Sequence, residues 1–222
     1  MDKFSPSGSF CLKSLRVRRF ILLNIRVAKA LHDCARTDGW LNDRSSSALV
    51  VSTISSNGAY NLAPFSFFNA VCSEPPLITF ATGHRVPPKD TLANARATGE
   101  FVVNIVSEEI AEKMNLCSGE YPGGVSEFEI SGLTPVASDL VRAPRVLESR
   151  INMECRVLQI LDLSTRPMGG SLVIGEVLRF HLDAAIVTNL RIDPEKLRAV
   201  GRMGANEYTR TRDRFQMIRP QV

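Results

Sequence analysis

Short runs of apolar and β-branched residues, separated by polar turns, dominate the chain from residue 48 onward. The run at 48–54 is followed by Ser-Ser-Asn-Gly at 55–58, in which Asn-Gly can adopt the positive φ of a tight turn. Extended structure resumes at 59–62. The pattern therefore predicts a β-hairpin over residues 48–62.

Four further runs have the length and composition of strands: 77–81, 101–106, 151–162 and 172–182. The last two are joined through Arg-Pro-Met-Gly-Gly at 166–170 and predict a second hairpin. Within 151–162 the apolar alternation shifts phase at Leu158 and Ile160. Such a shift indicates a β-bulge or bend, which small barrels use to close.

Two helices are expected between these strands. Asp90 is suited to be the N-cap of a helix through about residue 96, and Gly99 is suited to stop it. A second helix is expected from Ser107 to about Leu116, with glutamates in its first turn, where the helix dipole favours acids. Residues 123–143 contain Gly-Gly and Pro punctuation and are interpreted as a surface loop.

These elements predict a mainly β fold of six mostly antiparallel strands, with two helices at the ends of strands. A chain of 222 residues suffices for one such domain with a core of its own. We place this domain at 48–222, after a poorly ordered extension and linker at 1–47.

The charge distribution argues against a nucleic-acid-binding surface on the folded part. Residues 1–32 carry seven basic side chains and one acid, a net +6, whereas the whole chain carries +4, which leaves −2 for the rest. The basic segment has the composition of a mitochondrial transit peptide or of a disordered tail. No apolar run approaches the roughly 20 residues that span a bilayer. We expect a cytoplasmic protein, with a mitochondrial location as the alternative, and no nucleic acid or membrane partner.

The usual catalytic motifs are absent from the sequence. There is no Gly-x-Ser-x-Gly elbow, Walker loop or His-Glu-x-x-His. Five single cysteines indicate a reducing compartment rather than a disulfide framework or zinc cage, and His32, His84 and His181 are widely separated. We expect no metal, and His181 is interpreted as a residue at a strand end.

Two segments instead suggest a mononucleotide site. Residues 61–69, Asn-Leu-Ala-Pro-Phe-Ser-Phe-Phe-Asn, could lay backbone polar groups along a flat heteroaromatic ring, although the phenylalanines could equally be core. Residues 84–94 place cations and a hydroxyl at a helix start, where free N–H groups favour a phosphate. An ordinary capped helix would look the same.

Several motifs recur in order and carry a family resemblance: 51–69, Pro75-Pro76, 89–94 (Lys-Asp-Thr-Leu-Ala-Asn), 99–104 (Gly-Glu-Phe-Val-Val-Asn) and 201–208 (Gly-Arg-Met-Gly-Ala-Asn-Glu-Tyr). With them, residues 48–220 resemble the flavin reductase-like family of FMN-binding split barrels. The resemblance implies a six-stranded Greek-key barrel that forms a homodimer with FMN at the interface. Ser45–Ser47 depart from the family, whose members commonly have a Pro-Arg-Pro-type segment there.

The resemblance also implies which residues would contact the cofactor. Those near the isoalloxazine and ribityl chain would be Ser52, Thr53, Asn61, Ala63, Pro64, Phe65 and Ser66, with Ser66 the nearest candidate to flavin N5 and O4. Those at the phosphate would be Arg85, Lys89, Asp90, Thr91 and Asn94. Arg202, Asn206 and Tyr208 would lie near the cleft, reaching over from the partner subunit in one arrangement.

The implied activity is hydride transfer from NAD(P)H, the co-substrate, to flavin and on to an acceptor, with no dedicated acid or base. Two alternatives stay open. One is a non-enzymatic FMN-binding or electron-carrier protein, including a dimeric module that has lost its cofactor. The other is a split-barrel oxidoreductase that uses another reductant or oxidises a small pyridoxine-like substrate.

Overall fold

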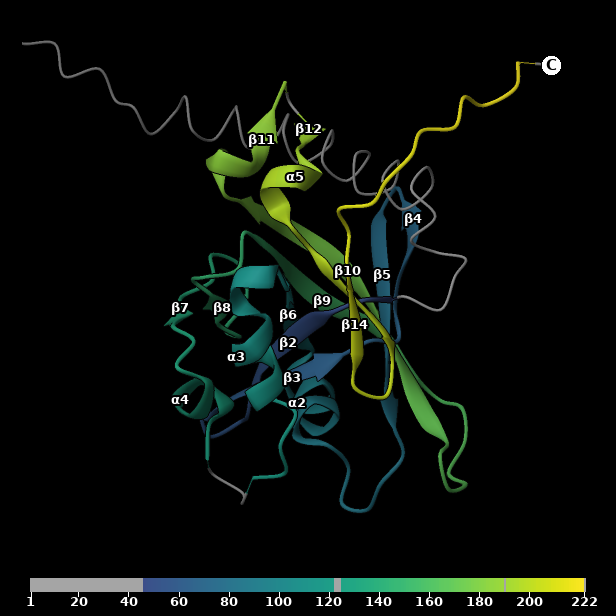
Figure 1. The fold of residues 1–222 in the computed structure, drawn as a ribbon. Helices are drawn as coiled ribbons and strands as arrows, with labels where there is room; N and C mark the ends of the chain where they lie inside the picture. The colour runs from purple at the N-terminus through teal and green to yellow at the C-terminus, as the bar shows by residue number, and fades with distance from the viewer. Residues whose placement is uncertain (1–45, 122–124, 190, 222) are drawn as a thin grey trace, which may run out of the picture.

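A computed structural model describes residues 46–121, 125–189 and 191–221, and its centre is an antiparallel sheet of seven strands (Figure 1). The strand order is β3-β2-β6-β9-β10-β5-β4. The strands are β2 Leu49–Ile54, β3 Tyr60–Phe65, β4 Phe68–Ser73, β5 Pro76–Gly83, β6 Glu100–Ile105, β9 Ile151–Asp162 and β10 Gly170–Leu182. The predicted fold class, mainly β with peripheral helices, is confirmed, and each of the six predicted strands lies in this sheet.

The seventh strand corrects the interpretation of residues 61–69 as one extended segment. The chain breaks after Phe65, turns at Ser66 and Phe67, and returns as β4 along β5. Phe65 is buried in the core, with its ring centroid 5.0 Å from that of Phe80, whereas Phe67 is 77% exposed. The aromatic residues of this segment therefore separate into core and surface.

Both faces of β2 are buried, which explains its unbroken apolar run. Leu49 and Val51 belong to the main core with Phe80 and Phe101, because alternate side chains of a strand point to the same face. Val50 faces the opposite way, into a second apolar cluster under the helices. A strand covered on both sides loses the polar alternation of a half-exposed strand.

The predicted bulge in the first long strand is confirmed. In the β9–β10 pairing, Ile174 is opposite Gln159 but Gly175 is opposite Val157, so the register skips Leu158. A Cβ atom at Gly175 would collide with the Phe101 ring, so the glycine lets this ring fill the core beside the bulge. The hairpin of β9 and β10 extends beyond the rest of the sheet (Figure 1).

The two predicted helices are present with adjusted starts. Helix α2 spans Asp90–Thr98 and ends at Gly99, whose φ of 70° is the left-handed cap conformation. Its N-cap is Lys89 and not Asp90, which lies in the first turn. The second begins as the 3-10 turn η1, Glu108–Ile110, and continues as α3, Ala111–Leu116.

The interpretation of residues 123–143 as a surface loop with short extended pieces is wrong for part of the described segment. Helix α4, Glu127–Ser131, lies beside α3 against β3, and Phe128 and Leu133 are buried in the second apolar cluster (Figure 1). Val141 and Ala143 are buried further along the segment. Gly and Pro punctuation marked the turns of this segment, but the few apolar side chains between them decide where it packs.

A second, smaller sheet contains the end of the domain. It consists of β1 (Ser46–Ser47), β13 (Val200–Gly204) and β14 (Glu207–Arg210), in the order β1-β13-β14. The short elements β7 Pro135–Val136, β8 Arg145–Val146, η2 Ala184–Ile186, β11 Val187–Thr188, β12 Arg191–Ile192 and α5 Pro194–Leu197 complete the fold. Of the extension and linker predicted at 1–47, residues 1–45 lie outside the described residues, whereas Ser46 and Ser47 form β1 and pair with β13. None of the described helices is long and apolar enough to cross a membrane.

Candidate functional site

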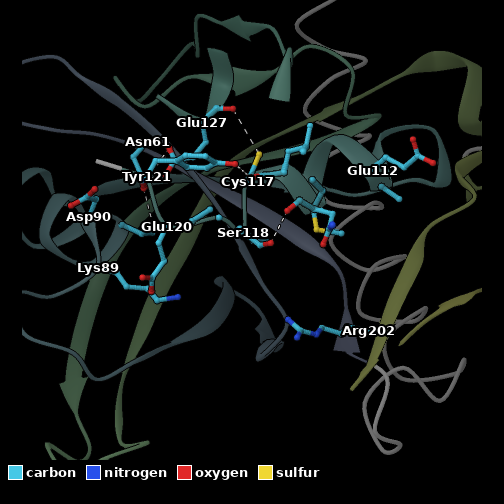
Figure 2. Close-up of a pocket in the computed structure, with 18 of the residues that line it drawn as sticks. Asn61, Lys89, Asp90, Glu112, Cys117, Ser118, Glu120, Tyr121, Glu127 and Arg202 are labelled. Atoms are coloured by element: carbon cyan, nitrogen blue, oxygen red, sulfur yellow. Dashed lines mark hydrogen bonds between the residues drawn. The ribbon is translucent and has the colours of Figure 1, made fainter. Parts of the chain in front are cut away.

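A cavity of about 1210 Å³ opens between three parts of the fold. One wall is β3 with the start of α2, the second is α3 with the turn that follows it, and the third is the β13–β14 hairpin (Figure 2). Ligand pockets commonly enclose about 300–1,000 Å³. The cavity is therefore large enough for a nucleotide-sized ligand and part of a second molecule.

Three cations face this cavity: Arg85, Lys89 and Arg202. In Figure 2, Lys89 lies near the start of α2 and Arg202 reaches into view from β13. Burial, reinforced by the nearby charge of Arg85, lowers the pKa of Lys89. Among the described residues, Arg85 pairs with the exposed Glu120, whose Oε1 lies 3.8 Å from Nη1. A bound anion would relieve the repulsion between Arg85 and Lys89, so the end of the cavity with these two cations fits a phosphate.

The start of α2 adds to the same end. Within the described residues, no side chain caps this helix terminus, and its N-cap residue is Lys89 itself. The first N–H groups of a helix carry positive dipole ends and lack partners inside the helix. A helix of nine residues that begins directly after Lys89 is a suitable cradle for a phosphate group.

Behind the cavity wall, polar side chains of three elements bond to one another. The Asn94 amide donates to Thr53 Oγ1 at 3.0 Å, and the Thr53 hydroxyl donates to Asn61 Oδ1 at 3.2 Å. Thr91 Oγ1 donates to the same oxygen at 2.8 Å. This network joins β2, β3 and α2 and holds the start of α2 against the sheet.

The cavity brings together many of the residues that the resemblance implies: Asn61, Ala63, Pro64, Arg85, Lys89, Asp90, Thr91 and Arg202, with Asn206 and Tyr208. The remaining residues of that set do not line it: Ser52, Thr53, Phe65, Ser66 and Asn94. Thr53 and Asn94 act one layer behind, through the polar network.

Ser52 lies on the opposite face of β2 from Thr53, because neighbours in a strand point to opposite sides. Its hydroxyl donates to the Pro144 carbonyl at 2.5 Å and accepts from the Asn104 amide at 3.1 Å. Phe65 is a core residue, although Lys89 Nζ lies 5.8 Å from its ring centroid. Ser66 is half-buried at the break between β3 and β4. Of these three residues, Ser52 thus belongs to a buried polar cluster through its bonds to Pro144 and Asn104, and has a structural role.

Residues 111–121 form a whole cavity wall that the sequence did not single out. Tyr121 folds back so that its hydroxyl donates to the Leu116 carbonyl at 2.7 Å, and its ring lies against Gly119 (Figure 2). Burial raises the pKa of the Cys117 thiol to about 11, so it stays protonated at neutral pH and is a poor nucleophile. The signal that could have marked this wall is the Gly119–Tyr121 pair next to a helix end.

Glu127 was missed as well. This first residue of α4 lines the cavity, and its carboxylate accepts hydrogen bonds from the Asn61 amide and the Leu62 N–H. Burial raises the pKa of Glu127, and the charge of Asp90 adds to the effect against the lowering by these hydrogen bonds. It lay in the segment interpreted as a loop, 66 residues from Asn61 in sequence.

On another face, Asp139, Glu154 and His181 come close enough to suggest a metal site. Glu154 is fully buried, contacts His181 Nε2 at 2.5 Å and accepts from the N–H groups of Asp139 and Leu140. The Asp139 carboxylate is paired with Arg179. These groups satisfy one another as a structural tie, and His181 lies near the end of β10, where the sequence placed it.

Comparison with known proteins places these features in a wider context. The family model of the flavin reductase like domain matches residues 43–199. An uncharacterised protein of Aquifex aeolicus is 41% identical over 163 residues, which cover 72% of this chain and 81% of that protein.

Two solved structures share the architecture. The 2-nitrobenzoate 2-nitroreductase NbaA of Pseudomonas fluorescens has 33% identity and a TM-score of 0.70, covering 78% of this chain and 85% of that one. A Shewanella frigidimarina protein, named for a flavin reductase with a split barrel domain, has 28% identity and a TM-score of 0.71, covering 79% and 87%.

Proposed function

The chain belongs to the flavin reductase-like domain family, and from that premise we propose that it binds FMN in the cavity and transfers hydride from NAD(P)H to the flavin. The observation that carries this proposal is the end of the cavity where Arg85, Lys89 and the uncapped start of α2 converge. These groups match a terminal phosphate, because they supply two cations and free N–H donors at one place.

In this assignment the chain's residues bind and orient, and none of them performs acid or base chemistry. Lys89 and Arg85 hold the phosphate, while Ala63 and Pro64 offer compact backbone beside the ring system. Arg202 and Tyr208 close the other side of the cavity, with the guanidinium 6.0 Å from the ring centroid. When bound, FMN supplies the capacity to accept a hydride from a nicotinamide and to pass electrons on.

The absence of an activated nucleophile from the described cavity wall agrees with this assignment. Cys117 is held as a thiol, and the described wall contains no histidine. The volume of about 1210 Å³ leaves room beside a mononucleotide for part of a second reactant, as a hydride transfer between two rings requires. We therefore favour a reductase over a simple carrier.

We also propose a homodimer whose interface lies near the cavity, and a reducing, cytoplasmic location. Phe215, Met217 and Ile218 support the formation of a dimer, because all three are at least 84% exposed in the C-terminal stretch and offer an apolar association surface. The free thiols of Cys72, Cys117 and Cys155 support the second. Light scattering on the purified full chain tests the dimer.

The deciding experiment is an FMN titration followed by anaerobic addition of NADH and then NADPH, monitored by flavin absorbance. Binding with rapid bleaching by one donor supports the reductase and names the donor. A bound flavin that neither donor reduces supports the carrier or the use of another reductant. A chain that does not bind FMN contradicts the assignment.

A further inference from the structure

The side-chain amide of Asn61 is fixed in one orientation by its neighbours. Its Nδ2 lies 3.0 and 3.2 Å from the two carboxylate oxygens of Glu127, and its Oδ1 accepts from the hydroxyls of Thr91 and Thr53. Rotating the amide by half a turn would place its oxygen against a carboxylate. Both lone pairs of Oδ1 are used by hydroxyls, so this oxygen is not free to accept from a ligand.

Glu127 is the group at the end of this network. Its Oε2 also accepts from the Leu62 backbone N–H at 2.9 Å, so one carboxylate binds two consecutive residues of β3. Glu127 begins α4, and Asn61 passes the contact on to Thr91 in the first turn of α2. A single carboxylate therefore links α4, β3 and α2 at the cavity wall.

We propose that Glu127 is a positioning residue for the phosphate end of the cavity. Its carboxylate fixes the Asn61 amide, and through Thr91 it holds the start of α2 where Lys89 and the helix N–H groups can meet a flavin phosphate. The proposal rests on the proposed function for its ligand, but the link from Glu127 to α2 exists without one. Hydrogen bonds to a charged acceptor are the stronger kind, which suits this role.

Protonation would weaken the arrangement, because a neutral carboxyl group offers one fewer acceptor to three N–H contacts. The titratable groups that face Glu127 are Asp90 at the start of α2 and Cys117 after α3. Cys117 stays neutral, and Asp90 raises the pKa of Glu127 in the same direction as burial does. FMN affinity should therefore fall as the pH falls through the raised pKa of Glu127.

The test compares Glu127→Gln with Glu129→Gln, an exposed glutamate of the same helix. The first measurement is amide hydrogen exchange in the ligand-free protein. We expect faster exchange at the start of α2 and in β3 for Glu127→Gln, and the wild-type pattern for Glu129→Gln. Unchanged exchange in Glu127→Gln would overturn the proposal, whether or not the chain binds FMN.

The second measurement is the dissociation constant of FMN as a function of pH. For Glu127→Gln we expect about a tenfold higher constant at neutral pH. Its acid dependence should also be weaker than that of Glu129→Gln, which shares any titration of the phosphate itself. A double-mutant cycle with Asn61→Ala should be non-additive, because Glu127 acts through Asn61. Additive effects in the cycle, or equal FMN affinities and pH profiles in the two glutamine variants, would refute the positioning role. If the wild type does not bind FMN, that result contradicts only the proposed function.

Discussion

Two glutamates behave in opposite ways in this fold, one half-buried and one fully buried. Glu127, at the cavity, accepts from the Asn61 amide and one backbone N–H, and its pKa is raised. Glu154 lies on another face of the sheet, and its burial alone would raise its pKa. Hydrogen bonds from His181 and two backbone N–H groups outweigh that burial and hold its pKa at about 2.

The difference lies in the partners, because Glu154 is the more deeply buried carboxylate and still has the lower pKa. Glu154 has His181 and more backbone donors, and it fastens the loop at 139–140 to the sheet. Glu127 has neutral donors and a like charge, Asp90, nearby. Burial alone therefore does not mark a functional carboxylate, and the carboxylate whose pKa is raised is the one beside the cavity.

The largest effect is expected at the structural carboxylate. Glu154→Gln should lower the free energy of unfolding by about 3 kcal/mol, because its NH2 group would face buried N–H donors. FMN affinity should change little. Urea unfolding measures the free energy of unfolding, and flavin titration measures the FMN affinity. Glu176→Gln, in a half-exposed pair with Arg156, is the control and should cost less than about 1 kcal/mol. If Glu154→Gln loses as much FMN affinity as Glu127→Gln does, the distinction between a structural carboxylate and a cavity carboxylate is wrong.

Acid unfolding sharpens the same contrast. The folded pKa of Glu154 lies below its ordinary value of 4.5, so its ionisation stabilises the fold above about pH 4.5, and that stability is lost as the pH falls toward 2. The wild type should lose about 2 kcal/mol more than Glu154→Gln between about pH 5 and pH 2. Urea unfolding at each pH of this range measures the free energy of unfolding. If this free energy falls equally with pH in the two proteins, the pKa of Glu154 is not shifted.

At the cavity, charge should matter for binding and not for folding. Lys89→Ala should raise the dissociation constant of FMN about tenfold, because it removes a charge-assisted contact to the phosphate. The unfolding free energy should stay the same or rise slightly, since a half-buried lysine beside Arg85 is lost. Arg96→Ala, on the same helix but paired with Asp162 outside the cavity, is the matched control. If the two variants bind FMN with equal affinity, Lys89 does not contact the phosphate and the assignment of the phosphate to this end of the cavity is wrong.

The sequence predicted the sheet well because strand length, turn chemistry and the phase shift at Leu158 are local signals. It failed where the outcome depends on which face a side chain occupies. Ser52 and Thr53 are adjacent and were both expected at the flavin, yet only Thr53 is connected to the cavity wall, through its bond to Asn61.

Contacts between distant segments were also invisible in the sequence. Glu127 meets Asn61 across 66 residues and His181 meets Glu154 across 27, and no periodicity announces such pairs. The cations at 85–89 were easier to find, because a helix start and its flanking charges lie together in the chain. The candidate site was thus predictable at the end with Arg85 and Lys89 and not at the wall formed by 111–121.

That missed wall provides the smallest expected effect. A Cβ atom at Gly119 would lie 2.7 Å from both Cζ and the hydroxyl oxygen of Tyr121, so Gly119→Ala must displace the ring and strain its bond to the Leu116 carbonyl. We expect about a threefold change in FMN or NAD(P)H affinity, a cost well below that of losing a phosphate contact. Adding Tyr121→Leu removes the ring that the new methyl group meets, so Gly119→Ala should have no further effect in that background. If Gly119→Ala weakens binding equally with and without the tyrosine, the ring does not shape the cavity, and the wall contributes through its backbone alone.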